Sequence, residues 1–458
     1  MSSSQPAGPV IVHVPGDSST MHPQVRLAVV GAGSRGMNYA RIAVESGAVI
    51  VAVADPDPMH RERFAADHGL ADAAVFADWR DLVARPKLAD AVVIATPDKL
   101  HAEPAVAFAE AGYHLLLEKP MAPTEVESLR IVEAAEANDV TLMICHVMRY
   151  SGYTRMLKNV LDSGRIGTIV SVEHLEPIGW WHFAHSYVRG NWAREADSSS
   201  MLMAKSSHDL DWLSFIVGQP AARVSSFGSL SHFTPANKPA RAADKCVNCP
   251  LINSCAYSAP KIYNRFLGDP VGERWPLSVV TNTVTPAGLA DALRDGPYGE
   301  CVYNGQNDVV DHQVVNLEFA DGATASFTVV AFTELDFRKT RIFGTHGSID
   351  GNGRSFEVHD FVTDTKEIVD TEVAGGASAA DGHGGADNEL VETFIEAIQS
   401  GDRSLITSGA RSSLHSHQLV WAAELARKTG TVVSIDQVTG SPILPDVPAE
   451  EPVLALTP

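Results

Sequence analysis

The stretch RLAVVGAGSRG, residues 26–36, decides the fold of this chain. Its apolar first half fits a buried strand, and the glycine cluster at residues 31–36 follows without a break. A helical stretch from Met37 to Ser46 and a second apolar run, VIVAVAD at residues 49–55, come next. Strand, glycine turn, helix and strand in this order predict a βαβ unit.

The glycine turn has the spacing G-x-G-x-x-G, which on its own would predict only an ordinary tight turn. Here a predicted strand precedes it, a helix follows, and Asp55 lies 19 residues after Gly36, near the position of a carboxylate that binds the adenosine ribose. We therefore predict a dinucleotide site. NAD is preferred over NADP because a carboxylate repels a 2′-phosphate, although Arg35 could soften that preference. The residues expected at the cofactor are Gly31, Gly33, Ser34, Arg35, Gly36 and Asp55.

The alternation of short apolar runs with helices continues to about Val147, which is typical of a doubly wound parallel sheet. Beyond it, runs such as DHQVVNLEF (residues 311–319) and ATASFTVVAF (residues 323–332) predict strands joined by tight turns. We therefore predict an α/β fold with an NAD-binding Rossmann domain at residues 25–147. An α+β domain at residues 148–440, with a large and mostly antiparallel open sheet, would hold the substrate and the oligomer contacts.

The composition excludes several classes of protein. Of the 458 residues, 45% are hydrophobic, which is enough for the buried cores of two or three domains. The net charge of −21 repels phosphate backbones and anionic lipid surfaces, so we expect neither a nucleic-acid nor a membrane partner. Residues 1–24 lack the features of a secretory signal and predict a flexible tail on a cytoplasmic protein, and residues 441–458 predict an extended tail.

Polar residues gather at the carboxyl ends of two neighbouring predicted strands, where doubly wound folds bind their ligands. Thr96 and Pro97 end one strand, and Glu118-Lys119-Pro120 ends the next. A lysine at such a place costs free energy unless it is paired or functional, and Glu118 is its obvious neighbour. A structural ion pair is the alternative to a catalytic role.

The segment TPDKLHAEPAVAFAEAGYHLLLEKPMAPT, residues 96–124, resembles the Gfo/Idh/MocA family of nicotinamide-dependent sugar and polyol oxidoreductases. The similarity continues through SSHDLDWL at residues 206–213 and covers the chain from about Val25 to Ile435. The resemblance implies that Lys119 touches the substrate hydroxyl and the nicotinamide ribose, and that His208 is the second catalytic residue. It adds Thr96, Pro97, His101, Glu118 and Lys119 to the expected cofactor contacts.

One position departs from the family pattern. The family commonly has an aspartate four residues before the histidine, whereas this chain has Ala204, followed by Lys205. Asp211 lies three residues after His208, so on a helix it could orient the imidazole in place of the missing acid. A solvated helix-surface charge explains that spacing equally well.

Cations and aromatic residues gather near the predicted substrate pocket. Aromatic faces suit the apolar face of a sugar ring, and fixed cations suit an acidic group on it. The pattern favours an acidic sugar or its glycoside as the substrate. The candidate substrate contacts are His146, Arg149, Tyr153, Trp181, His182, Lys205 and Asp209.

Four of the five cysteines form a further pattern. Cys246, Cys249 and Cys255 lie within ten positions, and Cys301 follows later in the chain. This spacing favours a closed site of four thiolates, for which we prefer structural zinc over an iron–sulfur centre or free thiols. The cluster begins in a segment at about residues 235–263 that interrupts the strand pattern and predicts an insertion.

Three functions stay open at this point. The leading prediction is an NAD-dependent oxidoreductase that acts on a hydroxyl of a sugar, polyol or glycoside, with Lys119 and His208 taking its proton. Some proteins resembling this family are NAD-dependent glycosidases, which oxidise a ring hydroxyl transiently, eliminate the aglycone, add water and return the hydride. A non-catalytic NAD sensor is the third possibility. The open face of the second sheet favours a homo-oligomer, either a dimer or a tetramer.

Overall fold

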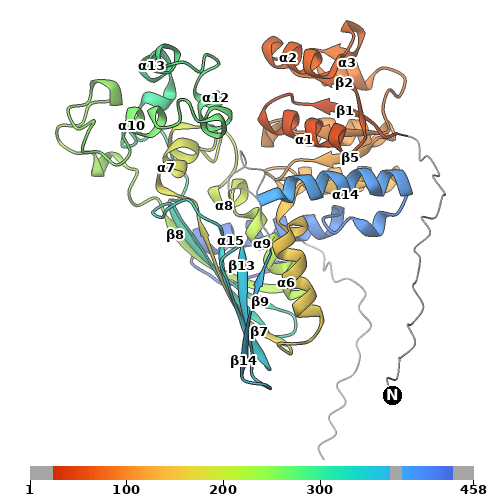
Figure 1. The fold of residues 1–458 in the computed structure, drawn as a ribbon. Helices are drawn as coiled ribbons and strands as arrows, with labels where there is room; N and C mark the ends of the chain where they lie inside the picture. Colours follow the sequence, from red (N-terminus) through yellow and green to blue (C-terminus); the bar gives the residue numbers. More distant parts are fainter. Residues whose placement is uncertain (1–23, 372–383, 437–458) are drawn as a thin grey trace, which may run out of the picture.

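The computed structural model describes residues 24–371 and 384–436 of the chain. Its first part is a six-stranded parallel sheet with the order β3-β2-β1-β4-β5-β6, seen at the upper right of Figure 1. The direction of winding reverses between β1 and β4, which is where doubly wound sheets bind ligands. The predicted Rossmann-type sheet is confirmed.

Every helix of this first part connects two strands of the parallel sheet. The glycine turn leads into the first helix, and the side chain of Thr124 caps the last one by accepting a hydrogen bond from the backbone N–H of Glu127. The strands are β1 (Arg26–Val30), β2 (Val49–Ala54), β3 (Val75–Phe76), β4 (Ala91–Ile94), β5 (His114–Leu117) and β6 (Leu142–Ile144), and the helices are α1 (Ser34–Glu45), α2 (Pro58–His68), α3 (Trp79–Val83), α4 (Ala102–Glu110) and α5 (Glu125–Ala137).

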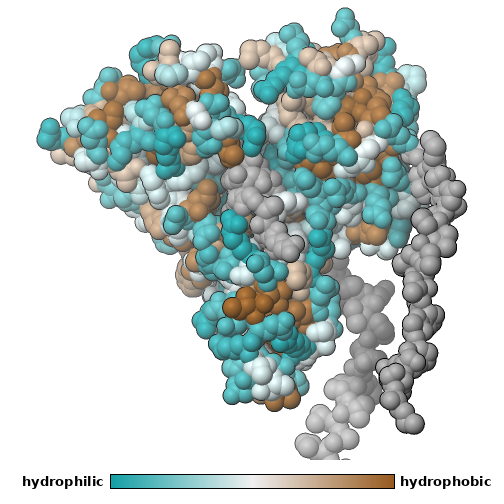
Figure 2. Space-filling model, viewed as in Figure 1, coloured by the Kyte–Doolittle hydropathy of each residue, from teal (hydrophilic) through white to brown (hydrophobic). Residues whose placement is uncertain are grey.

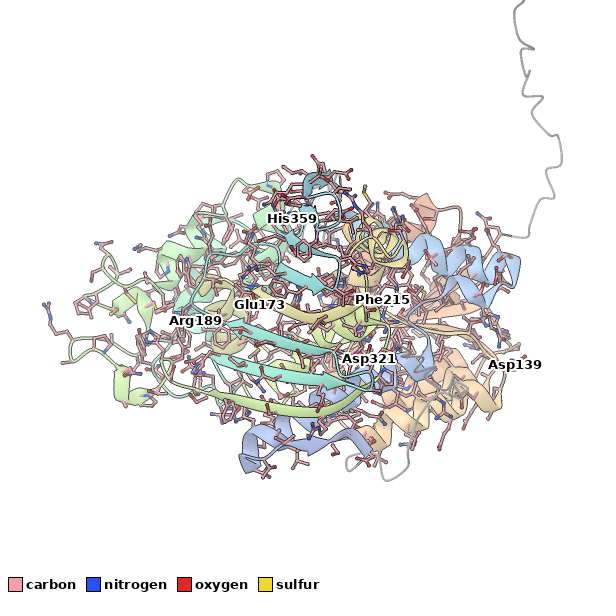
Figure 3. All side chains as sticks on the ribbon, turned by 90° about the horizontal axis from the view of Figure 1, so that it is seen from below. Asp139, Glu173, Arg189, Phe215, Asp321 and His359 are labelled. Atoms are coloured by element: carbon pink, nitrogen blue, oxygen red, sulfur yellow. The ribbon has the colours of Figure 1, made fainter. Side chains whose placement is uncertain are left out.

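The second part is a nine-stranded sheet with the order β14-β13-β12-β11-β7-β10-β9-β8-β15. All of its neighbouring strands are antiparallel except β7 and β10, so the prediction of a large, mostly antiparallel sheet is confirmed. Figure 3 looks onto this sheet from below, with Glu173 of β7 near its centre. The strands are β7 (Ile169–Pro177), β8 (Ala221–Ser229), β9 (His312–Phe319), β10 (Thr324–Val330), β11 (Lys339–Gly344), β12 (Gly347–Gly351), β13 (Ser355–Asp360), β14 (Thr365–Asp370) and β15 (Val433–Ser434).

Helices cover one face of the second sheet and then return to the first. The helices α6 (Gly152–Asp162), α8 (Met201–Ala204), α9 (Ser207–Val217) and α15 (Ala410–Thr429) share a core with the sheet. The helix α14 (Ala386–Ser400) instead packs Leu390 and Phe394 into the same core as Tyr39 of α1. The unit around the first sheet therefore includes a helix that the predicted division near residue 147 assigns to the second domain.

The insertion forms a lobe between β8 and β9, at the upper left of Figure 1. Its core joins Ile262, Leu277, Leu289 and Leu293 to Trp181. Because Leu289 and Leu293 belong to this core, the lobe extends well beyond residue 263, where the sequence predicted its end. Its helices are α10 (Ala259–Asn264), α11 (Pro270–Gly272), α12 (Ser278–Val280) and α13 (Pro286–Asp295), and Trp181 lies on α7 (Trp180–Phe183).

The predicted terminal tails, residues 1–24 and 441–458, lie outside the described residues except for Gln24. Among the helices of residues 24–371 and 384–436, none combines the length and the apolar character needed to cross a membrane.

Candidate active site

A large cleft lies between the first sheet and the insertion lobe, and its opening is visible in Figure 2. Its volume is about 2270 Å³. The walls combine the glycine turn, the carboxyl ends of β4 and β5, the start of α9 and part of the lobe. The cleft therefore joins the predicted cofactor site to the predicted catalytic residues.

The glycine turn has the shape that a bound pyrophosphate requires. Gly31 has φ +92°, and a Cβ atom there would lie 2.7 Å from the carbonyl oxygen of Ala95. A Cβ atom on Gly36 would lie 1.9 Å from the carbonyl oxygen of Gly31, whereas one on Gly33 would meet nothing within 4 Å. Gly33 is also the N-cap of α1 and makes no side-chain cap, so the first N–H groups of that helix, from Ser34 onward, are available to an anion.

Asp55 lies at the carboxyl end of β2 and lines the cleft. Its carboxylate accepts hydrogen bonds from the backbone N–H of Ala32 at 2.7 Å and of Asp57 at 2.8 Å. It therefore holds the glycine turn in place and also presents a carboxylate beside the expected adenosine ribose. The glycine turn, the start of α1 and Asp55 together fit a dinucleotide.

Arg35 is held in a buried cluster at the same turn. Its Nε atom lies 2.7 Å from Glu118 Oε1, and its Nη1 atom lies 2.8 Å from Asp387 Oδ2. The hydroxyl of Tyr39 also donates to Glu118, at 2.7 Å. Burial alone would raise the pKa of Glu118, but the positive charges of Arg35 and Lys119 hold it below its usual value.

Lys119 follows β5 and lines the cleft, where its Nζ atom donates a hydrogen bond of 2.6 Å to the backbone carbonyl of Ala204. Its only hydrogen bond with Glu118 is made by its backbone N–H, so the predicted neighbour pairs mainly with Arg35. Burial lowers the pKa of Lys119, and the charge of Lys205 lowers it further despite the opposing effect of Glu118. The position where the family commonly has an aspartate thus contributes a backbone carbonyl.

His208 stands in the first turn of α9 and lines the cleft together with Lys119. Lys205 also reaches the cleft, but its Nζ atom lies 3.0 Å from Glu176 Oε1. Arg338, which the sequence analysis did not single out, lies 2.6 Å from Glu176 and 2.9 Å from Asp209. These two cations are therefore neutralised by buried carboxylates.

His101 connects two strand ends at the site. Its Nδ1 atom lies 2.7 Å from the carbonyl oxygen of Pro120, and its Nε2 atom lies 2.7 Å from that of Thr96. The buried ring therefore ties the ends of β4 and β5 together, whereas the sequence predicted a direct cofactor contact. Thr96 and Pro97 themselves line the cleft, and their contact with the cofactor stays a prediction.

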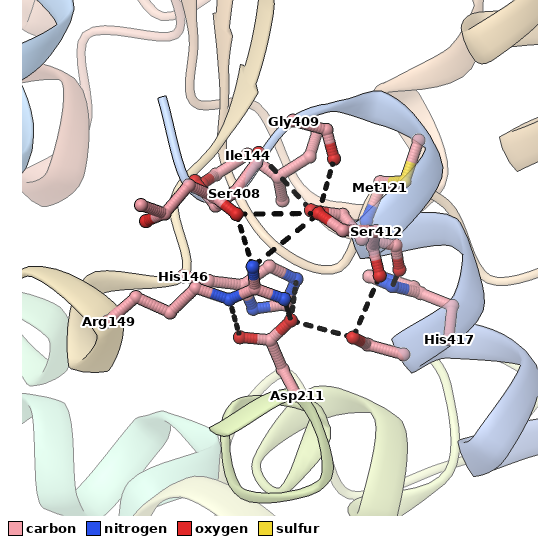
Figure 4. Close-up of polar contacts among 12 residues, drawn as sticks. Met121, Ile144, His146, Arg149, Asp211, Ser408, Gly409, Ser412 and His417 are labelled. Atoms are coloured by element: carbon pink, nitrogen blue, oxygen red, sulfur yellow. Dashed lines mark hydrogen bonds and ion pairs between the residues drawn. The ribbon is translucent and has the colours of Figure 1, made fainter. Parts of the chain in front are cut away.

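Arg149 belongs to a buried network between the two sheets, drawn in Figure 4. Its Nε atom donates to Asp211 at 2.7 Å, and its Nη1 atom donates to the carbonyl of Thr407. Asp211 also accepts from Ser416 at 2.7 Å and lies 3.6 Å from Nε2 of His146. Burial would raise the pKa of Asp211, but Arg149 and His146 lower it below its usual value.

The network answers two predictions. Asp211 accepts hydrogen bonds from Arg149 and Ser416. These contacts explain its place on α9 without a role in orienting His208. His146 is fully buried, and burial lowers its pKa to about 3, so its ring is neutral. Neither Arg149 nor His146 is part of the cleft lining formed by the described residues.

Of the other predicted substrate contacts, some line the cleft and some lie outside its lining. His182 and Lys205 line the cleft. Tyr153 instead lines a small separate cavity, Trp181 packs in the core of the lobe, and Asp209 is fully buried beside Arg338 and His174. Burial would raise the pKa of Asp209, but Arg338 and His174 hold it well below its usual value.

Sequence reasoning missed several residues that the structure brings to the cleft, namely Asp98, Glu176, Tyr187, Trp275 and Arg338. Asp98 directly follows the Thr96-Pro97 pair that was singled out, so its place at the sheet edge was available from the same pattern. Glu176 lies on β7 and Arg338 directly precedes β11, so the two face each other only after the second sheet has formed.

The four clustered cysteines all lie in the insertion lobe as free thiols. Arg189 donates to Cys246 Sγ at 3.5 Å. Burial raises the pKa of Cys255 and Cys301, which favours their protonated forms. In the described part of the chain, no three side chains of histidine, cysteine, aspartate or glutamate are arranged to hold a metal ion, so the zinc prediction finds no support.

Two family models match the chain and together span both sheets. The model described as "Oxidoreductase family, NAD-binding Rossmann fold" matches residues 25–146. The model described as "Oxidoreductase family, C-terminal alpha/beta domain" matches residues 158–435.

Individual proteins are also similar. The chain is 25% identical over 359 residues to the oxidoreductase YteT of Bacillus subtilis, covering 74% of this chain and 79% of that protein. It is 28% identical over 213 residues to the 2,7-anhydro-N-acetylneuraminate hydratase of Escherichia coli, covering 46% of this chain but only 55% of the hydratase. The solved structure of levoglucosan dehydrogenase with NADH has a TM-score of 0.64 at 19% identity, covering 90% of this chain and 99% of that one, which shows a shared fold.

Replacing Arg149 by methionine tests whether this residue is structural. The variant leaves Asp211 buried without its main partner, so we expect the free energy of unfolding to fall by about 3 kcal/mol. The matched control is Arg155→Met, which breaks an exposed pair with Glu389 and should cost less than about 1 kcal/mol. Urea unfolding followed by circular dichroism measures both. Unchanged stability with a raised KM would instead restore the prediction that Arg149 binds substrate.

Proposed function

Because the chain belongs to the Gfo/Idh/MocA family of oxidoreductases, we propose that it uses NAD to oxidise a hydroxyl group of a sugar, polyol or glycoside. One observation carries the proposal. The partly buried amino group of Lys119, with its lowered pKa, lies in the same cleft as the glycine turn and His208. A base, a second proton-accepting group and a dinucleotide cradle therefore surround one space.

The residues that would hold the dinucleotide are the glycine turn, the N-terminus of α1 and Asp55. When bound, NAD supplies an acceptor for the hydride of the carbon that carries the hydroxyl group. Asp55 favours NAD over NADP by charge. Arg35 does little to change this preference because Glu118 and Asp387 already neutralise it.

Lys119 takes the proton of the substrate hydroxyl in this proposal. Burial favours its neutral form, which is the form that can accept a proton. The carbonyl of Ala204 holds Nζ at one position, while Glu118 holds the backbone of the same residue. His208 stands on the same cleft as the second proton-accepting group.

The paired cations favour a substrate recognised by its hydroxyl groups. Lys205 and Arg338 are each bound to Glu176, and Arg149 is bound to Asp211 behind the cleft. An acidic group on the sugar would have to compete with these buried carboxylates. We therefore place a neutral sugar or glycoside ahead of the acidic one that the sequence pattern favoured.

A redox-neutral glycosidase is the second candidate. Two observations favour it: the cleft volume of about 2270 Å³ exceeds the roughly 1,000 Å³ at the upper end of ordinary ligand pockets, and the chain is similar to a hydratase of an anhydro sugar. In this alternative the oxidised sugar loses its aglycone by elimination, water adds to the product, and the hydride then returns to the ketone. Lys119 and His208 would serve the same proton transfers.

The pH dependence of the reaction tests the role of Lys119. Since the neutral amine is the base, kcat/KM for hydroxyl oxidation should rise with pH, with an apparent pKa below the value of about 10.4 for an ordinary lysine. Lys119→Met should lower kcat at least about 100-fold and flatten the profile. The matched control is Lys158→Met, which removes an i,i+4 ion pair with Asp162 on a helix surface and should change neither kcat nor the pH profile. A flat profile in the unchanged enzyme would contradict this role.

Product analysis separates the two candidates. We expect incubation with NAD and a panel of aryl glycosides, sugars and polyols to form NADH in proportion to the sugar oxidised. Release of the aryl group without NADH would instead support the glycosidase. Absorbance at separate wavelengths follows both products in one sample. Neither product with any compound, together with no measurable binding of NAD, would contradict both candidates.

We also propose that the face of the second sheet that none of the described helices covers is an interface between copies of the chain. Phe227 of β8 and Ile368 of β14 are 67% and 71% exposed, while Ser226 next to Phe227 is buried and Val369 next to Ile368 packs against the core. Light scattering should therefore give the mass of a dimer or tetramer, and Phe227→Glu should lower it without unfolding the protein. A monomeric mass for the unchanged chain would contradict the proposal.

A further inference from the structure

The insertion lobe builds a wall of the cleft whose side chains the proposed reaction does not use. Trp275, Asn282 and Gln306 of the lobe line the same space as Lys119. The cleft volume of about 2270 Å³ is more than twice the roughly 1,000 Å³ at the upper end of ordinary ligand pockets. The cleft therefore has room beyond a dinucleotide and one sugar ring.

Trp275 is fixed in position on this wall. Its ring centroid lies 4.8 Å from that of His182, 5.3 Å from that of His185 and 5.4 Å from that of Trp181. The residue is partly buried against the core of the lobe, and it also lines the cleft. It therefore offers a rigid aromatic surface that costs little entropy to engage.

Two polar side chains with unpaired hydrogen-bonding atoms in the described structure, Gln306 and Arg189, line the same cleft as Trp275. The amide of Gln306 donates to the carbonyl of Cys301 at 3.0 Å, while its buried Oε1 atom has no hydrogen-bond partner among the described residues. Arg189, which is 5% exposed and lines the cleft, donates from Nε to Glu300 and from Nη2 to Tyr257. Its buried Nη1 atom has no such partner in the same part of the chain.

An aromatic face, one unpaired acceptor and one unpaired donor match the surface of a sugar ring. The apolar face of the ring packs on an indole, and its hydroxyl groups both donate and accept. We propose that Trp275, Gln306 and Arg189 form a second sugar-binding subsite, so that the substrate is a disaccharide or other glycoside with a sugar on each side of the linkage. The inference rests on the proposed function, which concerns the sugar ring that reacts, and it adds a binding site for a second sugar ring that does not react.

Matched substrates and variants test this subsite. The probes are cellobiose and maltose compared with glucose, and lactose compared with galactose, with NADH formation giving kcat/KM for each. Trp275→Ala should lower kcat/KM for the preferred disaccharide about tenfold, mainly through KM, and leave the monosaccharide unchanged. Gln306→Leu should act in the same direction. The control is Trp180→Ala, because Trp180 of α7 packs on Tyr257 of the lobe but is outside the cleft lining.

A binding measurement keeps the two hypotheses apart. Saturation-transfer NMR with the same disaccharides reports the subsite whether or not the sugar reacts, and thermal unfolding checks that each variant is folded. Trp275→Phe keeps the core contacts if the alanine variant unfolds, and it should weaken the disaccharide less. A monosaccharide preferred over every disaccharide, or an equal loss for both in Trp275→Ala, would overturn the subsite. Disaccharide binding that depends on Trp275, without any turnover, would overturn the proposed reaction alone.

Discussion

The buried carboxylate of Glu118 is the contact on which the arrangement of the site depends. Arg35 of the glycine turn and Tyr39 of α1 both donate to it, and Arg35 reaches Asp387 of α14 with its other nitrogen atoms. One guanidinium therefore joins the nucleotide-binding turn, the strand that carries Lys119 and a helix from the far end of the chain. Since a buried charge without a partner costs several kcal/mol, each of the three elements resists displacement.

The charge of the whole chain and the charge of its cleft are separate quantities. The net charge of −21 belongs to the composition, and it predicts how the molecule repels phosphates and anionic lipids. Inside the protein, Glu176 pairs with Lys205 and Asp211 pairs with Arg149, the two cations that the sequence pattern assigned to an acidic substrate. Asp209 pairs with Arg338, which the pattern did not single out. The local field of the cleft therefore depends on pairings between residues far apart in the chain, which composition does not contain.

Much of the first domain could be predicted from short-range pattern. The glycine spacing, the strand before it and Asp55 after the second strand are set by neighbours in the sequence, and the structure brings them together as expected. Lys119 and His208 were placed through the family resemblance, and both line the cleft.

The substrate side was harder to predict because it is built from distant pairs. Arg149 and Asp211 are 62 positions apart, and Arg338 and Asp209 are 129 apart. A lone arginine after a strand has the same pattern whether it faces the cleft or a buried carboxylate. The extent of the lobe was predicted too short for a related reason. Its helices are short, and its core includes Trp181 from a preceding segment.

The contact between Lys119 and Ala204 has a consequence for how this site can change. A backbone carbonyl is supplied by every amino acid, so the identity of the side chain at position 204 does not enter the hydrogen bond. A carbonyl also carries no titratable proton, so this partner is the same at every pH at which the protein is folded. The lysine thus depends on the path of the chain between α8 and α9 rather than on one side chain. Drift at position 204 is tolerated as long as that path and the small space around it persist.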